Sequence, residues 1–285
     1  MAERAADEPR EKRSVRMGQK RSSAESKESD PHSRPGMVRL HSDRGQKIMR
    51  SAAFQGGYPM DRKQKTKTSC GVCSAAIVVS CIRGMNISEK TVLQDASSSA
   101  KELRTRTKKC ARSRCPTCRN LRDLTMCLEN WRRSGCSLYH LNALLRHGLS
   151  LKTRFHFTSD SKIQTFERAL RRFEAKQSHI LVNVRIKRGG HWGVVAAVSR
   201  VEGDDGLPET QILVLEVNNP RLHYWVSATT LYQFMDTITS ARVTRGWIEV
   251  LVQSSVPAVQ LDADPVNEDT APATPAEKEA ACRTS

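Results

Sequence analysis

The residue best suited to chemistry in this sequence is Cys70, which opens an apolar stretch and is followed directly by Gly71. Apolar residues behind it recur at helical spacing, so the sequence predicts a helix that begins at Cys70 and ends at Gly84. The unpaired N–H groups and positive dipole end of a helix N-terminus favour an anionic sulfur. Gln64 precedes Cys70 by six residues, and its amide could join the Cys70 backbone N–H in binding an oxyanion. The segment thus predicts a nucleophilic cysteine, with a buried structural thiol as the alternative.

A histidine in a glycine-rich segment is the second candidate. His191 stands in the sequence GGHWG, residues 189–193, at the start of an apolar run. A lone strand histidine is more often a hydrogen-bonded core residue, but the glycines here leave room to approach a substrate. The next apolar run carries Glu216 and Asn218, either of which could hold the imidazole through its second nitrogen. Together with Cys70, these residues predict a thiolate that attacks an amide carbonyl while His191 handles the proton.

The elements that must position these residues fall into two halves. Besides the helix behind Cys70, helical periodicity predicts helices over residues 138–147 and 162–175. Runs of β-branched and aromatic residues, separated by Gly, Asp and Pro turns, then predict strands, at residues 180–184, 192–198, 212–217, 224–226 and 247–252. Helices followed by an antiparallel sheet form an α+β arrangement, with the nucleophile on a helix and the histidine and acid on strands.

The composition predicts one folded domain between two tails. Residues 1–51 are charged and Ser-rich, and residues 253–285 combine Pro and Ala with acids, so neither segment can offset the entropy cost of ordering. We therefore expect the catalytic domain over residues 52–252. Inside it, residues 95–122 are basic, contain cysteines and lack an apolar period, which predicts a loop or insertion.

Charge and cysteine usage limit the partners and the compartment. The formal net charge is +17 with a pI near 9.8, as in proteins that bind polyanions. Much of the charge lies in the N-terminal tail and in residues 101–133, with few aromatics to stack on bases, so nucleic acid is not the predicted partner. The cysteine count of nine is odd, and no apolar run suits a signal peptide or a membrane span. We expect reduced thiols and a cytoplasmic protein.

Four of the cysteines are close enough in sequence to suggest a metal site. Cys110, Cys115, Cys118 and Cys127 have the spacing C-x4-C-x2-C-x8-C. Four thiolates suit a tetrahedral Zn²⁺ or a softer ion, and the CPTC segment alone could be a zinc knuckle or a redox pair. No second C-x2-C follows, so the spacing alone does not establish a metal site. Metal binding by these four cysteines is therefore a hypothesis.

In chain order, these segments resemble the phytochelatin synthase family, glutathione γ-glutamylcysteinyltransferases of the papain-like clan. QKTKTSCGVCS at residues 64–74 resembles the family's Q-x5-C-G nucleophile segment, and GHWGVVAAV at 190–198 is similar to its G-H-F-S-P-I-G-G-Y. LVLEVNNPRLHYWV at 213–226 resembles the segment with the family's triad Asp, and RGW at 245–247 its closing R-G-F. The resemblance implies a papain-like α+β fold.

The resemblance also implies roles for individual residues. Glu216 stands where the family has Asp, so it is the expected partner of His191, with Asn218 as the alternative after the manner of papain. The segment that follows is one residue shorter than in the family, which leaves Arg221, with Gly190, as the expected substrate contacts. Cys73 replaces a family Ala and is expected to fill space in the core.

The implied reaction is acyl transfer from glutathione. Cys70 would attack the Cys–Gly carbonyl, Gln64 would stabilise the oxyanion and His191 would protonate the departing glycine, leaving a γ-Glu-Cys acyl-enzyme. Transfer to glutathione or a phytochelatin lengthens the peptide, and transfer to water makes the chain a glutathione hydrolase. No cofactor is required for this chemistry; a divalent heavy-metal ion such as Cd²⁺ or Zn²⁺ is expected as activator or as the thiolate complex of the substrate. The alternatives are a papain-like peptidase acting on proteins and a non-enzymatic metal- or nucleic-acid-binding protein.

Overall fold

The long strand β5 (Gly189–Glu202) lies inside an eight-stranded antiparallel sheet with the order β1-β7-β6-β5-β4-β8-β3. The short strand β2 pairs with β5 beyond the end of β4. This architecture comes from a computed structural model that describes residues 37–50, 52–54, 57–108, 115–159, 161–186, 189–202, 206–236 and 246–252. The other strands are β1 (Val38–Arg39), β2 (Ala53–Phe54), β3 (Thr153–Phe157), β4 (Ser178–Ile186), β6 (Pro208–Glu216), β7 (Tyr224–Ser227) and β8 (Gly246–Leu251).

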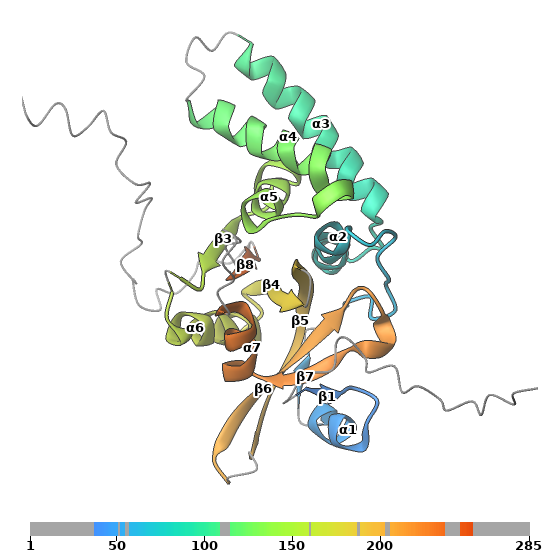
Figure 1. The fold of residues 1–285 in the computed structure, drawn as a ribbon, viewed down its shortest axis with the longest axis vertical. Helices are drawn as coiled ribbons and strands as arrows, with labels where there is room; N and C mark the ends of the chain where they lie inside the picture. The colour runs from blue at the N-terminus through green and yellow to red at the C-terminus, as the bar shows by residue number, and fades with distance from the viewer. Residues whose placement is uncertain are drawn as a thin grey trace, which may run out of the picture. The chain divides into compact units, whose positions relative to one another are not determined.

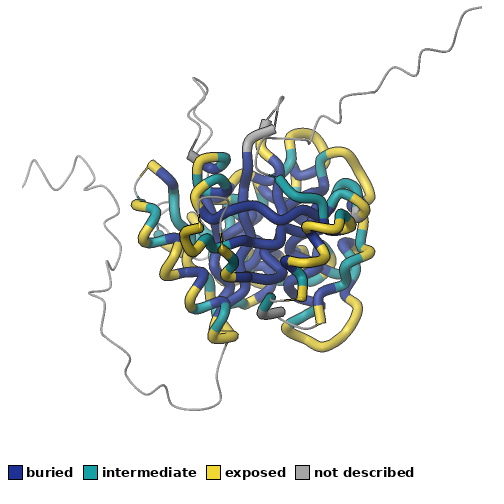
Figure 2. The backbone as a smooth tube through the Cα atoms, turned by 90° about the horizontal axis from the view of Figure 1, so that it is seen from below, coloured by how far each residue is buried: buried dark blue, intermediate teal, exposed yellow. Residues whose placement is uncertain are grey.

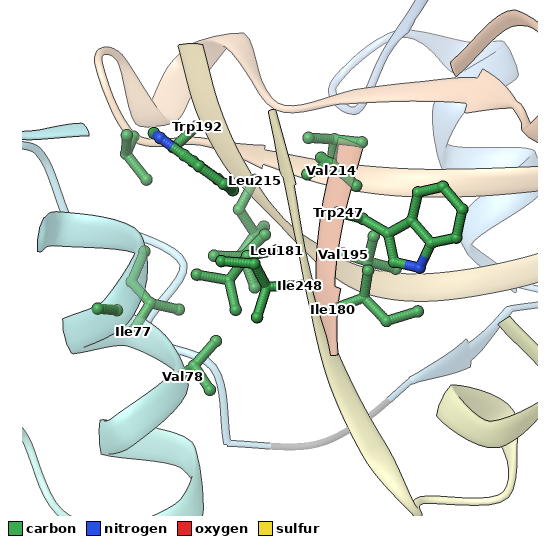
Figure 3. Packing of buried hydrophobic residues seen from close by; sticks show 14 of the residues in the cluster. Ile77, Val78, Ile180, Leu181, Trp192, Val195, Val214, Leu215, Trp247 and Ile248 are labelled. Carbon is green, nitrogen blue, oxygen red and sulfur yellow. The ribbon is translucent and has the colours of Figure 1, made fainter. Parts of the chain in front are cut away.

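Helices cover both faces of the sheet (Figure 1). On one face, Ile77 and Val78 of α2 point toward sheet residues such as Leu181 (Figure 3). On the other face, Trp247 packs edge-on against Phe166 of α6. The helices are α1 (Asp43–Arg50), α2 (Cys70–Arg83), α3 (Glu89–Thr107), α4 (Pro116–Ser134), α5 (Leu138–Ala143) with the π-helical turn η1 (Leu144–Gly148), α6 (Ile163–Glu174), the 3-10 turn η2 (Pro220–Leu222) and α7 (Ala228–Asp236).

The predicted α+β arrangement is confirmed, and so are its main elements. Helix α2 begins at Cys70 as expected and ends at Gly84, whose φ of 63° is the left-handed conformation that glycine adopts at little cost. All five predicted strands are present within β4 to β8, although β6 and β8 each end one residue earlier than expected. Their buried residues form the centre of the described part of the chain (Figure 2). No helix within the described ranges is long and apolar enough to cross a membrane.

The prediction of an unfolded tail through residue 51 is wrong for residues 38–50. Strand β1 pairs with β7, and Leu40 and Ile48 are buried. Only two of the eight residues of helix α1 are buried. The face that contacts the sheet is therefore narrow, and the mostly polar sequence shows no apolar period for it. Residues 1–36 and 253–285 lie outside the described residues.

The prediction of a loop over residues 95–122 is wrong for most of that segment, which belongs to the helices α3 and α4. Ser88 caps α3 by accepting a hydrogen bond from the Thr91 N–H, and the Cys115 sulfur does the same for Cys118 at the start of α4. Only four residues of α3 are buried, and two of them are the small residues Ala96 and Ala100, so the helix has little apolar period to detect. Residues 109–114 lie outside the described residues.

Candidate active site

The candidate nucleophile Cys70 is buried at the first position of α2, with 7% of its surface exposed. Ser69, the residue before the helix, does not cap it, because its hydroxyl is engaged with Thr66. The first turn contains no acidic residue. The helix N-terminus is therefore available to an anion, either the Cys70 thiolate or the oxygen of a substrate carbonyl.

Gly71 allows the start of α2 to lie close to strand β5. A Cβ atom at this position would lie 3.0 Å from the Cys136 Cβ and 3.2 Å from the Trp192 Cδ1, both tighter than an ordinary contact. The Trp192 indole N–H also donates to the Cys136 carbonyl at 2.8 Å. The neighbour of the nucleophile is thus packed directly against the neighbour of the candidate base, His191.

The sheet then brings His191 together with Glu216. Glu216 lies opposite Gly193 in the β5–β6 register, so its side chain shares a face with that of His191, two residues away. His191 Nε2 and Glu216 Oε1 are 2.6 Å apart, and both side chains are buried. Asn218 contributes its backbone instead, since its N–H donates to the same carboxylate oxygen at 2.8 Å. Of the two candidates for the acid position, the structure therefore places Glu216 against the imidazole.

The same contacts determine the charge state of His191. Burial disfavours a charged ring, but hydrogen bonds with Cys70 and Glu216, and the negative charges of both partners, raise the pKa of His191 to about 10. Since Glu216 occupies Nε2, Nδ1 is the ring nitrogen left for Cys70. The imidazole is therefore protonated at neutral pH, and an imidazolium beside a cysteine is the arrangement that supports a thiolate nucleophile.

Gln64 lies on a loop that is tied to both halves of the fold. Its N–H donates to the Val217 carbonyl at 2.7 Å, next to Glu216, and the N–H of Lys65 donates to the Glu89 carboxylate at 3.0 Å. Gln64 is 9% exposed, and its amide oxygen has no hydrogen-bond partner among the described residues. The backbone of the loop is fixed while the side-chain amide oxygen is left without a protein partner.

Two buried polar residues that contact the Gln64 loop were not identified from the sequence. Glu89 is buried at the start of α3, where it also forms a hydrogen bond with Cys73. Cys73 is fully buried in the core, as expected, and burial together with Glu89 raises the pKa of its thiol well above the ordinary value. The second is His223, which contacts the backbone of Glu216. Glu89 stands in no recognisable motif, whereas His223 lies within the matched segment 213–226 but at a position to which no role was given. Only its burial as a polar residue distinguishes each of them.

The two predicted substrate contacts lie at the surface. Arg221 is exposed on η2, where its N–H donates to the Asn219 side chain. Gly190 is exposed near the start of β5, and a Cβ there would lie 2.6 Å from the Asn183 amide oxygen, so a larger residue would have to displace the Asn183 side chain. A substrate role for either residue stays a prediction.

Of the four cysteines of the predicted metal site, the three within the described ranges, Cys115, Cys118 and Cys127, are not brought together as a set. Cys127 lies on α4 nine residues beyond Cys118, roughly 13 Å along the helix, and its sulfur is 3.6 Å from that of Cys136. The hydrogen bond between these two thiols, together with burial, raises the pKa of Cys136 well above its ordinary value. No group of three or more His, Cys, Asp or Glu residues in the described ranges could hold a metal ion. Cys110 lies outside those ranges, so the hypothesis remains a prediction.

A cavity of about 850 Å³ lies beside the Gln64 loop, between that loop and the helices α3 and α4. Lys65 and Thr66, which directly follow Gln64, form part of its wall. The lining carries four cations and one acid, namely Lys65, Lys90, Lys101, Arg132 and Glu89. Its excess of positive charge suits a ligand that carries several carboxylates.

The comparisons with known proteins identify the family of the chain. The sequence pattern of phytochelatin synthase matches residues 31–247, most of the chain. Comparison with curated proteins finds no significant match. The matching pattern implies an enzyme of the transpeptidase type with a glutathione-dependent activity. The family inferred from separate sequence segments is therefore confirmed, and the chain belongs to the phytochelatin synthase family.

Proposed function

We propose that this chain is a glutathione γ-glutamylcysteinyltransferase that works through a γ-Glu-Cys acyl-enzyme on Cys70. The observation that carries the proposal is the continuous contact from the buried Cys70 through His191 to Glu216, with a distance of 2.6 Å in its second step. Family membership supplies the substrate, glutathione. The contact supports the assignment of Cys70 as nucleophile, His191 as acid–base group and Glu216 as the residue that orients it.

In the first half-reaction, the Cys70 thiolate attacks the carbonyl carbon of the Cys–Gly peptide bond of glutathione. The Cys70 N–H and the Gln64 side-chain amide stabilise the oxyanion of the tetrahedral intermediate. When this intermediate collapses, the imidazolium of His191 gives its proton to the glycine nitrogen, so that glycine leaves as a neutral amine. The thioester of γ-Glu-Cys with Cys70 remains, and His191 is neutral.

In the second half-reaction, the amine of another glutathione or of a phytochelatin attacks the thioester. Neutral His191 takes a proton from this amine, and Cys70 departs as thiolate, which restores the starting ion pair. The product is longer by one γ-Glu-Cys unit. If water attacks instead, free γ-Glu-Cys forms, and the chain acts as a glutathione hydrolase. Cd²⁺ or Zn²⁺ enters the proposal as an activator or as the thiolate complex of the peptides.

The basic cavity beside the Gln64 loop supports a peptide substrate with several carboxylates. Glutathione has two carboxylates, and each added γ-Glu-Cys unit brings one more. Lys90 and Lys101 lie in the cavity wall on α3, and Arg132 faces them from α4. We propose that these cations attract the acidic peptides toward the site, an effect that salt would weaken.

The test is incubation of the full chain with glutathione, with and without Cd²⁺, followed by chromatography and mass spectrometry of the products. Free glycine together with longer γ-Glu-Cys peptides, or with free γ-Glu-Cys, supports the proposal. A mass increase on the Cys70 peptide equal to one γ-Glu-Cys acyl group would identify the intermediate. Cys70→Ser is the control, since a hydroxyl lacks the acidity for this attack. Cleavage of protein substrates without glycine release from glutathione would point to a peptidase and contradict the proposal.

A further inference from the structure

A buried histidine outside the Cys70–His191–Glu216 contact links the two segments that complete the candidate site. His223 is 3% exposed and lies at the end of η2. Its Nδ1 accepts a hydrogen bond from the backbone N–H of Glu216 at 2.9 Å. Its Nε2 is 2.6 Å from the carbonyl oxygen of Met60, which belongs to the loop that leads to Gln64. One imidazole thus contacts the acid-bearing strand end and the Gln64 loop at once.

These contacts require one protonation state of the ring. A backbone N–H can only donate and a carbonyl can only accept, so Nδ1 must be unprotonated and Nε2 must carry the proton. The ring is therefore neutral, and both of its nitrogens are engaged. Burial lowers the pKa of His223 below the ordinary histidine value, although its bond to Met60 and the charge of Glu216 oppose this. The neutral form is thus the stable one at neutral pH.

A second hydrogen bond joins the Gln64 loop to the end of β6 and also fixes their relative position. The Gln64 N–H donates to the Val217 carbonyl, one residue beyond Glu216. His223 and this bond together hold the Gln64 loop against the end of β6 at two points four residues apart on the loop. A shift at either point would move the proposed oxyanion donor relative to His191 and its carboxylate partner.

We propose that His223 is a positioning residue that fixes the acid Glu216 and the Gln64 loop in register with each other. The bond through Nδ1 sets the backbone from which Glu216 reaches His191, and the bond through Nε2 sets the loop from which Gln64 reaches the oxyanion. The two effects are separable, because the two ring nitrogens contact different segments. The inference rests on the proposed function only where glycine release is the readout.

The test compares three substitutions of His223 with two readouts. In His223→Asn, the amide oxygen replaces Nδ1 and can still accept from Glu216, but the side chain is too short to reach Met60. In His223→Gln, the amide nitrogen replaces Nε2 and can still donate to Met60, but the acceptor for Glu216 is lost. His223→Ala loses both bonds. The readouts are the rate of iodoacetamide modification at the Cys70 peptide, which reports the His191–Glu216 pair without any substrate, and kcat and KM for glycine release.

We expect His223→Asn to keep the alkylation rate within about twofold while kcat falls on the order of 10-fold, since only the Gln64 loop is released. His223→Gln should slow both alkylation and kcat, and His223→Ala should lose the most, with KM little changed in all three. Rates equal to the parent's, or losses in all three variants that simply follow the fall in melting temperature, would overturn the proposal. If the parent releases no glycine, the proposed function fails, and the alkylation rates alone still decide the role of His223.

Discussion

At the scale of single residues, the acid beside His191 determines how the imidazole is held. Glu216 reaches the ring with one methylene more than the Asp of the family, and its carboxylate also accepts from the Asn218 N–H. Glu216→Gln should lower kcat for glycine release on the order of 10² or more, because an amide favours the wrong tautomer of the ring. Asn218→Ala should cost much less, since its backbone makes the contact. Steady-state kinetics of the two variants check this.

Glu216→Asp gives an independent measure of the strand position. Withdrawing the carboxylate by one methylene, roughly 1.5 Å, opens a contact that is now 2.6 Å long, so we expect a loss close to that of Glu216→Gln. Activity near that of the parent would mean that β6 shifts toward His191 to accommodate the shorter acid. A large loss in Asn218→Ala beside a small one in Glu216→Gln would instead assign the orienting role to the amide.

The pH dependence of the reaction follows from the raised pKa of His191. Glycine departs only if the ring carries a proton, so kcat/KM, which reports the free enzyme, should fall as the pH rises through about 10. The same proton stabilises the fold: because the pKa is raised above that of the unfolded chain, the contribution is complete below about pH 6.5 and is lost as the pH rises through about 10. In Glu216→Gln the alkaline limb of the kcat/KM profile should move to lower pH. A limb that stays in place would show that Glu216 does not support the imidazolium.

At the scale of elements, the contact between the start of α2 and strand β5 should be more important for activity than for stability. Gly71→Ala forces the Cys136 and Trp192 side chains to move by a few tenths of an ångström, which displaces Cys70 from His191. We expect kcat to fall at least 10-fold, measured alongside the melting temperature. Gly84→Ala is the matched control at the other end of the helix, where the left-handed φ of 63° makes alanine cost about 1 kcal/mol in stability. It should leave kcat unchanged, and equal kcat losses in the two variants would refute the argument.

The elements that the sequence predicted are those with a strong apolar period of their own. Helix α2 and the strands β4 to β8 bury nearly continuous apolar runs, so their types and order could be read directly. Strand β1 has two residues and helix α1 two buried positions, and neither gives a periodic signal without its partner. Elements of this kind depend on tertiary contacts that override local composition.

The same distinction applies to the candidate site. Cys70, His191 and Glu216 could be identified because their spacing and order match a family. His223 and Glu89 could not, since their contacts with the backbone of Met60, Glu216 and Lys65 exist only in the folded chain. The spacing of Cys118 and Cys127 suggested a shared ion, but helix rise separates them and places Cys127 beside Cys136.

At the scale of the whole molecule, a buried carboxylate joins the far edge of the sheet to helix α6. Glu249 on β8 is fully buried and accepts two hydrogen bonds from Arg172 and one from His156. Burial alone would raise its pKa, but these bonds and the positive charge of Arg172 lower it. Its contribution to stability is therefore present above the ordinary glutamate pKa and is lost as the pH falls through the lowered value.

Glu249→Gln should destabilise the fold by about 3 kcal/mol at pH 7, because it leaves the Arg172 guanidinium without its charge partner. The difference from the parent should shrink as the pH falls below the ordinary glutamate pKa, which urea unfolding at pH 7 and at a series of pH values from about 5 down to about 3 can measure. Arg200→Ala is the control, since the pair of Arg200 with Glu174 is largely exposed and should contribute under about 1 kcal/mol. A loss in Glu249→Gln no larger than in Arg200→Ala would contradict this role.

The residues of the candidate site are widely separated along the chain, and this affects when reactivity arises during synthesis. Gln64 and Cys70 leave the ribosome long before His191 and Glu216, and the contacts that join them are among the most non-local in the fold. Until strand β6 has been made and paired with β5, Cys70 has neither its imidazolium partner nor an ordered Gln64 loop. On the proposed mechanism, the nascent chain therefore carries an ordinary thiol, and the activated thiolate arises only in the completed sheet. A fragment that ends before His191 would be as unreactive toward glutathione as free cysteine.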